Sequence, residues 1–132
     1  MNMIFADLQD QSNPMNGSVI GDGERVYRFL DSLRTRKPFV AEFLGDNGYH
    51  LKCGIGGTVG CVQHSRADGD LPYLMAVVSK RIVDTEHVEF LMGDTPTPIA
   101  ARYILPFSLV MEIIAHFGET GERSAKVAWE AV

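Results

Sequence analysis

Residues 118–132 read GETGERSAKVAWEAV, and this stretch contains the only tryptophan of the chain. Thr120-Gly121 is a turn signal, and Val127 and Trp129 are two residues apart, which places them on one face of a strand. A tryptophan on such a face buries a large apolar area at a low cost in conformational entropy. We therefore predict a final strand that closes the core, with Trp129 as a binding hot spot as the alternative.

The size and composition of the chain are those of a globular protein. Its 132 residues are 45% hydrophobic and 22% charged, enough for one domain and too few for two ordinary ones. We predict a single domain over residues 1–132, with residues 1–20 forming an extra strand and loop. The net charge of -5 argues against direct binding to nucleic acid. It fits a basic partner, and solubility alone is the other interpretation.

Cysteine usage and hydropathy indicate the compartment. Cys53 and Cys61 are too few for a disulfide framework. Residues 1–11 lack the basic and apolar segments of a signal peptide, and no apolar run reaches the roughly 18 residues of a membrane span. We expect a cytoplasmic protein with reduced thiols and no membrane contact.

Hydrophobic periodicity predicts two helices, over residues 22–37 and 107–117. Asp22 can cap the first helix, and Gly118 suits the left-handed position after the second. Three cations follow the first apolar stripe, where C-terminal carbonyls favour positive charge: Arg34, Arg36 and Lys37.

Strand patterns occupy much of the remaining chain. They cover residues 3–8, 38–45, 49–55, 58–64, 71–79 and 87–92. The run 71–79 is almost continuously apolar, which is typical of a central strand covered on both faces. In the last run, Val88, Phe90 and Met92 are expected to point inward. Tight connections favour antiparallel pairing. We predict an α+β fold with a single antiparallel sheet of about five to six strands packed against two helices.

His50, Cys53, Cys61 and His64 have the residue types of a zinc site. Residues three apart on a strand point to opposite faces. If Gly56-Gly57 forms a two-residue turn, the numbers of paired residues add up to 113, and a register one residue longer gives 114. Neither register brings all four side chains together, so we expect buried cysteines and no metal or other cofactor.

Four glycines, Gly54, Gly56, Gly57 and Gly60, have the spacing of a phosphate-binding loop. Such loops lie between a strand and a helix, whereas here a strand follows. We therefore assign them to a turn and to close backbone approach. The serines and two of the histidines show no catalytic context: Ser65, Ser79, Ser108, His87 and His116.

Six acidic residues fall mostly in predicted turns: Asp46, Asp68, Asp70, Asp84, Glu86 and Asp94. They could form a negative rim that attracts a basic partner. Ordinary turn chemistry is the alternative, since aspartate favours turns.

The end of the chain also carries a recognisable series of motifs. Residues 101–106 (ARYILP) lead into an apolar helix, residues 117–123 (FGETGER) form a turn, and residues 127–130 (VAWE) follow. Together with PFVAE at residues 38–42 and the glycine hairpin, they resemble the type-one immunity protein family of bacterial polymorphic toxin systems. The resemblance covers roughly residues 20–132. Ser124 stands where that family usually has proline, and residues 1–20 have no counterpart.

The resemblance implies a non-enzymatic protein that binds and inhibits a cognate toxin, the C-terminal domain of a secreted effector, often a nucleic-acid deaminase or nuclease. We expect it to cover the substrate-binding face of the toxin. The candidate contact residues are Asp46, Tyr49, Arg66, Asp68, Asp70, Tyr73, Asp84, Glu86 and Asp94. The candidate structural residues are Gly54, Gly56, Gly57, Gly60, Tyr103, Pro106, Gly121 and Trp129. A small enzyme or small-molecule-binding α+β domain is the alternative.

Overall fold

The computed structural model describes residues 1–21 and 23–132. Within these residues the chain forms two α-helices, one short 3-10 helix and ten strands, so the predicted α+β class is confirmed and the strand number exceeds five to six. The helices are α1 (Gly23–Leu33), η1 (Ala101–Tyr103) and α2 (Phe107–Thr120). The strands are β1 (Met3–Asp7), β2 (Val19–Ile20), β3 (Phe39–Gly45), β4 (Tyr49–Ile55), β5 (Val59–Arg66), β6 (Leu74–Val77), β7 (His87–Met92), β8 (Thr95–Ala100), β9 (Leu105–Pro106) and β10 (Ala128–Ala131). Neither α-helix of the described chain has the length and apolar character needed to cross a membrane.

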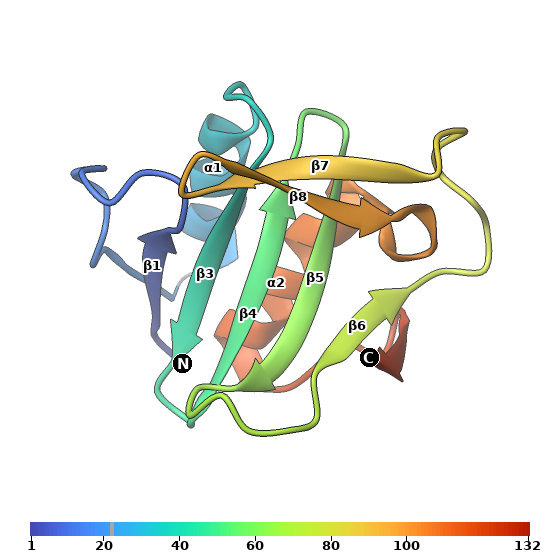
Figure 1. The fold of residues 1–132 in the computed structure, drawn as a ribbon. Helices are drawn as coiled ribbons and strands as arrows, with labels where there is room; N and C mark the ends of the chain where they lie inside the picture. Colours follow the sequence, from blue (N-terminus) through green and yellow to red (C-terminus); the bar gives the residue numbers. More distant parts are fainter. Residues whose placement is uncertain (22) are drawn as a thin grey trace.

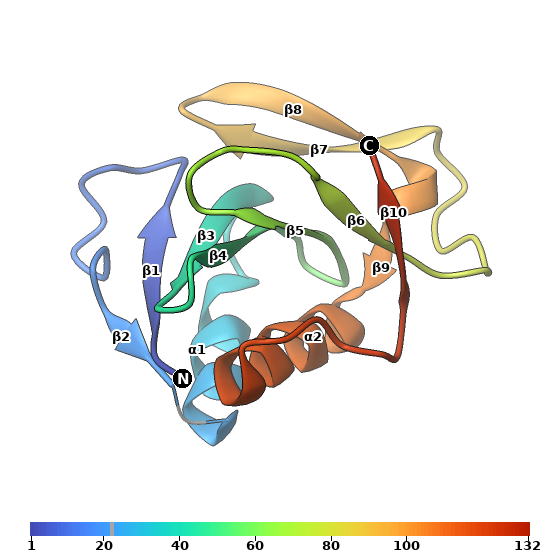
Figure 2. The same ribbon diagram turned by 90° about the horizontal axis from the view of Figure 1, so that it is seen from below.

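The strands form one sheet in the order β10-β6-β5-β4-β3-β1-β2, with antiparallel neighbours throughout this path. The β7–β8 hairpin joins β3 through one parallel bridge, Phe39 to Leu91, so the sheet is largely rather than wholly antiparallel. Figure 1 shows this hairpin crossing one face of β3, β4 and β5, with α2 behind the other face. Seen from below, both helices lie on one side of the sheet and the hairpin on the other (Figure 2).

Strands β4 and β5 are therefore covered by the helices on one face and, where the hairpin crosses them, on the other. On the helix side, the buried core includes Leu51, Cys53, Ile55, Val62, Val110, Ile114 and Phe117. Beneath the hairpin, a second buried cluster consists of Val40, Cys61, Met75, Phe90 and Ile104. The sheet thus separates a large apolar core from a smaller apolar cluster, and the rest of the hairpin-side face of β4 and β5 carries polar side chains such as Lys52 and Gln63.

The register of the central hairpin differs from both predicted registers. Cys53 pairs with Val62 and Gly54 with Cys61, so paired residue numbers add up to 115. Residues 56–59 form the turn, and the Gly56 amide donates to the Val59 carbonyl at 3.0 Å. Cys53 lies in the helix-side core and Cys61 in the hairpin-side cluster. Burial raises the pKa of both thiols, that of Cys61 to about 12.

Glycine is required at two positions of the β4–β5 hairpin, where helix α2 packs on one face and strand β7 on the other. A Cβ on Gly60 would lie 2.4 Å from the Gly54 carbonyl oxygen and 3.1 Å from Val110 of α2. A Cβ on Gly54 would lie 2.8 Å from Cys61 Sγ and 2.8 Å from the Phe90 ring of β7. These distances are too short for a side chain, so the glycines permit simultaneous packing on both faces.

The predicted helix ends are wrong at both helices. Helix α1 ends at Leu33, and two of the predicted C-terminal cations have other partners: Arg34 donates to the Gly57 carbonyl at 2.7 Å, and Arg36 binds Asp7 at 2.8 Å. The predicted cap, Asp22, lies outside the described residues. Helix α2 continues to Thr120, and Gly121 rather than Gly118 takes the left-handed conformation, with φ of 76°. Gly118 stays helical against Met3, whose Cε would lie 2.8 Å from an added Cβ.

Two strand predictions also need correction. The run 71–79 pairs only over Leu74–Val77 and lies next to the edge strand β10, not at the sheet centre. In β7, Phe90 is fully buried as predicted, Val88 is half-buried and Met92 is exposed. Strand β8 was not predicted because it contains two prolines; it lies at the edge of the sheet, where a missing N–H is tolerated.

The segment before the first predicted helix forms part of the sheet. Strand β1 lies between β3 and β2, which confirms the predicted strand near the N-terminus. Its last residue, Asp7, is buried and accepts hydrogen bonds from Asn13, Arg36 and two backbone amides. Desolvation would raise the pKa of Asp7, but the hydrogen bonds from Asn13 and Arg36 and those from the backbone leave it lowered.

Replacing Gly60 by alanine tests the close approach in the central hairpin. We expect Gly60→Ala to lower the free energy of unfolding by about 1–3 kcal/mol, because the backbone of Gly54 must move to admit a methyl group. Gly57→Ala is the matched control: nothing lies within 4 Å of its Cβ position, so a change within about 0.5 kcal/mol is expected. Chemical denaturation of both variants measures the difference, and equal stabilities would contradict the packing argument.

Candidate functional site

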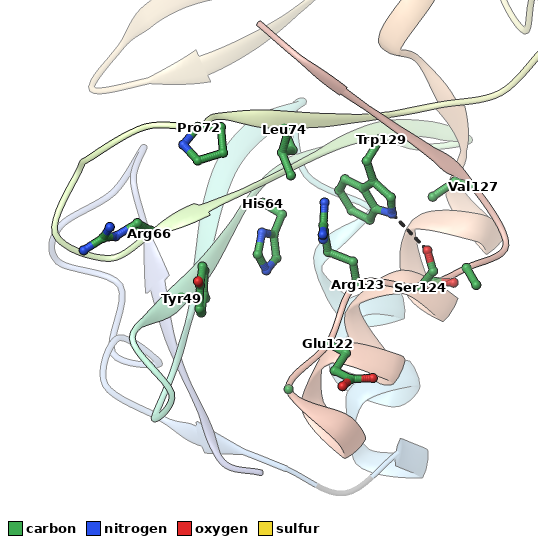
Figure 3. Close-up of a pocket in the computed structure, with 12 residues that line it drawn as sticks. Tyr49, His64, Arg66, Pro72, Leu74, Glu122, Arg123, Ser124, Val127 and Trp129 are labelled. Carbon is green, nitrogen blue, oxygen red and sulfur yellow. Dashed lines mark hydrogen bonds between the residues drawn. The ribbon is translucent and has the colours of Figure 1, made fainter.

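A groove of about 580 Å³ lies between the sheet and the segment that follows α2. Its sheet side is formed by Tyr49 of β4, His64 of β5, Leu74 of β6 and Trp129 of β10. The opposite side is the tail that leads from Gly121 into β10. Figure 3 shows these side chains converging from four strands and the tail. The groove is therefore a product of the tertiary fold rather than of one sequence motif.

Aromatic rings line the base of the groove. The rings of Tyr49 and His64 stack at 5.0 Å, and the His64 ring meets Trp129 edge-on at 6.0 Å and Phe117 at 5.9 Å. The Trp129 indole N–H donates to the Ser124 carbonyl at 2.9 Å. Trp129 packs against the main core and also lines the groove. It thus closes the core, as predicted, and offers part of its surface to the groove.

His64 is neutral at physiological pH. It is 8% exposed, and burial among these rings lowers its pKa to about 4, with the positive charge of Arg123 acting in the same direction. A neutral imidazole behaves here as an aromatic surface rather than as a cation.

The charged groups at the groove are two arginines and one glutamate: Arg66, Arg123 and Glu122. Arg66 is held by Asp68, with Nη2 and Oδ2 at 2.7 Å. Arg123 is exposed and has no ion-pair partner among residues 1–21 and 23–132. Its guanidinium extends between His64 and Trp129 (Figure 3).

Six of the nine predicted contact residues lie beside or within the groove. Tyr49 and Arg66 line it, and the loop after β5 adds Asp68, Asp70 and Tyr73. This loop is ordered by its own hydrogen bonds: the Asp70 amide donates to Asp68 at 2.9 Å, and the Tyr73 hydroxyl donates to the Gly69 carbonyl. Asp46 belongs to the neighbouring turn, whose Gly48 carbonyl accepts from the Ala67 amide at 2.8 Å.

The other three predicted residues lie elsewhere. Asp84 and Glu86 belong to the connection between β6 and β7, and Asp94 to the β7–β8 turn, both away from the loop after β5 in Figure 1. Asp94 binds Gln9, with the amide nitrogen of Gln9 and Asp94 Oδ1 at 2.6 Å. The predicted acidic residues therefore form separate groups rather than one rim.

The motif residues of the tail have identifiable contacts. The Tyr103 hydroxyl donates to Glu130 at 3.2 Å, and Arg102 forms an ion pair with the same carboxylate. These contacts join η1 to β10. Pro106 pairs with Val59 of β5 and precedes α2. Gly121 turns the chain after α2, and its carbonyl accepts from Asn47 Nδ2 at 2.8 Å.

Ser124 takes the position where the resemblance predicts proline. Its side chain accepts from the Lys126 amide at 3.2 Å, while its carbonyl accepts from Trp129. A serine at this position therefore keeps the tail ordered.

A series of polar side chains in contact with one another lies on the sheet face opposite the helices, and the sequence did not predict it. Ser65 Oγ and His50 Nε2 are 2.7 Å apart, and His50 Nδ1 lies 3.4 Å from Glu42 Oε2. The order of groups is that of a hydrolytic triad, but Ser65 is 2% exposed, so its hydroxyl cannot meet a substrate. We interpret it as a structural hydrogen-bond chain across β3, β4 and β5. Within the described chain, no three or more His, Cys, Asp or Glu side chains are grouped so as to hold a metal ion.

Comparison with known protein families gives a match that covers most of the chain. The family model described as "Immunity protein Imm1" matches residues 19–131, which includes both helices and nine of the ten strands of the described chain. No curated protein matches the sequence.

The low pKa of His64 has a consequence for stability. Between about pH 6.5 and 4 the unfolded chain binds a proton at His64 and the folded protein does not, so this residue makes stability fall as the pH falls through that range. We expect His64→Gln to reduce the slope of unfolding free energy against pH. His87→Gln, at an exposed position, should leave the slope unchanged. Denaturant titrations at several pH values measure it, and a wild-type slope in His64→Gln would contradict burial of a neutral imidazole.

Proposed function

The chain belongs to the Imm1 family of immunity proteins, and from this we propose that it binds a cognate bacterial toxin and inhibits it without catalysis. The family match over residues 19–131 is the observation that carries the proposal. The partner is the C-terminal toxin domain of a secreted effector, and the complex forms in the cytoplasm of the producing cell. The toxin is a nucleic-acid deaminase or nuclease.

Inhibition occurs by occlusion of the substrate-binding face. An enzyme that acts on nucleic acid needs a basic surface for the phosphate backbone. The net charge of -5 and the exposed carboxylates of Asp46, Asp68 and Asp70 complement such a surface. A hydrogen bond from the Asp70 amide and the contact with Arg66 lower the pKa of Asp68, so this carboxylate is ionised at neutral pH. These groups stand where phosphates would lie and exclude the nucleic acid.

A binding and inhibition experiment tests the proposal. The chain is mixed with the toxin domain encoded by the neighbouring reading frame, and the complex is examined by size-exclusion chromatography and calorimetric titration. We expect a stoichiometric complex and loss of the toxin's activity on nucleic acid at equimolar concentration. A toxin domain from an unrelated system serves as the control and should remain active. Absence of a complex at micromolar concentrations would overturn the proposal.

Charge reversal distinguishes the effect of the loop after β5 on the association rate from the effect of the total charge of the protein. We expect Asp68→Lys with Asp70→Lys to slow association by roughly 10-fold at low salt, because steering depends on charge near the contact. The control pair, Asp84→Lys with Glu86→Lys, makes the same change in net charge at another exposed loop and should slow association much less. Stopped-flow mixing at increasing salt measures both, and equal rates for the two pairs would show that the loop has no special role.

A further inference from the structure

The groove holds one exposed arginine, Arg123, that has no ion-pair partner among the described residues, whereas Arg66 is paired with Asp68. Two arginines and one glutamate line the groove, in a chain of net charge -5. We propose that the groove anchors an acidic segment of the toxin, with a large apolar side chain against Tyr49, His64 and Trp129 and a carboxylate on Arg123. The proposal rests on the function proposed above and adds the chemistry of the partner segment that this surface accepts.

The aromatic surfaces of the groove provide the contact for an apolar side chain. Tyr49 is 40% exposed although its ring stacks on His64, and Trp129 is only partly buried. An apolar side chain placed against these rings would remove them from water at a small cost in side-chain entropy, since they are already fixed by packing. Aromatic residues in partly formed pockets are typical hot spots of protein interfaces.

Arg123 provides the contact for a carboxylate. Arg66 already has Asp68 as a partner at 2.7 Å, whereas Arg123 is exposed and has no partner in the described part of the chain. A guanidinium offers paired N–H donors that match a carboxylate in a bidentate geometry. A basic segment would instead meet Arg123 with like charge, so charge complementarity selects an acidic one.

The groove is also organised before any partner binds. The tail that carries Arg123 is fixed at both ends, by the hydrogen bond from Asn47 to Gly121 at 2.8 Å and by that from Trp129 to Ser124 at 2.9 Å. A preorganised surface loses little conformational entropy on binding, which favours affinity. The groove therefore fits an extended or looped segment of a folded partner.

The two charged surfaces have distinct roles in this arrangement. The acidic loop after β5 faces the basic part of the toxin, and the groove beside it accepts an acidic segment. A partner must then present both signs of charge at the matching spacing, which excludes proteins that are merely basic. The groove thus adds a contact for a carboxylate and an apolar side chain to recognition, whereas the acidic loop increases the association rate.

Substitution of Arg123 tests the sign of the partner's charge. Affinity of each variant for the neighbouring-frame toxin domain is measured by calorimetric titration. We expect Arg123→Glu to weaken binding by at least about 10-fold and Arg123→Gln by less, because the first adds repulsion to the lost ion pair. Lys37→Glu, which makes the same charge change at an exposed position before β3, should change affinity by less than about 3-fold. Unchanged or tighter binding by Arg123→Glu would overturn the proposal.

Substitution of two equally exposed tyrosines tests the apolar contact. Tyr49 and Tyr27 are each 40% exposed, and Tyr27 lies on α1. We expect Tyr49→Ala to weaken binding by about 10-fold or more and Tyr27→Ala to leave it unchanged. If the wild-type chain binds and inhibits but either Arg123→Glu or Tyr49→Ala binds as tightly as the wild type, the groove proposal fails and the immunity function stands. If the wild-type chain does not bind the toxin domain, both fail.

Discussion

The structure depends on covering both faces of β4 and β5 at once where Gly54 pairs with Cys61. Helix α2 covers one face and the β7–β8 hairpin covers the other. Gly54 and Gly60 make this possible, because Phe90 and Val110 occupy the space that side chains at these positions would need. At the other end of these strands, Tyr49 of β4 and His64 of β5 contribute to the groove beside β6 and β10.

The first eighteen residues are outside the family match, but Met3–Asp7 among them form strand β1 of the sheet. Strand β1 pairs with β3 over five residues, and its buried Asp7 binds Arg36 from the segment after α1. Arg36 also lies over the Phe39 ring at 3.8 Å. A buried carboxylate needs such partners, since an unpaired one would be costly in free energy. This segment therefore stabilises the α1–β3 connection.

The sequence predicted the parts of the fold that are encoded locally. Both amphipathic helices and the α+β class were predictable, because apolar spacing repeats along the chain. The four-residue turn was not, because two glycines in succession also fit a tighter turn. Strand β8 was missed because prolines normally argue against a strand. In the groove, Tyr49 and Arg66 were predicted. His64 and Arg123 were not, because their proximity arises from the pairing of distant strands and the path of the tail.

The contacts of the tail connect stability to recognition. Trp129 and Val127 fill the core while Arg123 and Glu122, a few residues earlier, remain exposed at the groove. The ion pair of Arg102 with Glu130 and the hydrogen bond from Tyr103 hold β10 against η1. Because β10 supplies one side of the groove, any loss of these contacts would also displace Trp129. Tyr103, Gly121 and Trp129 are thus constrained by packing, whereas Glu122 and Arg123 belong to the same motif series and stay exposed at the groove. The tail motif therefore supplies Arg123 of the groove, and Tyr49 and Arg66 lie outside the motif, where a change of side chain can adapt the surface to a different partner.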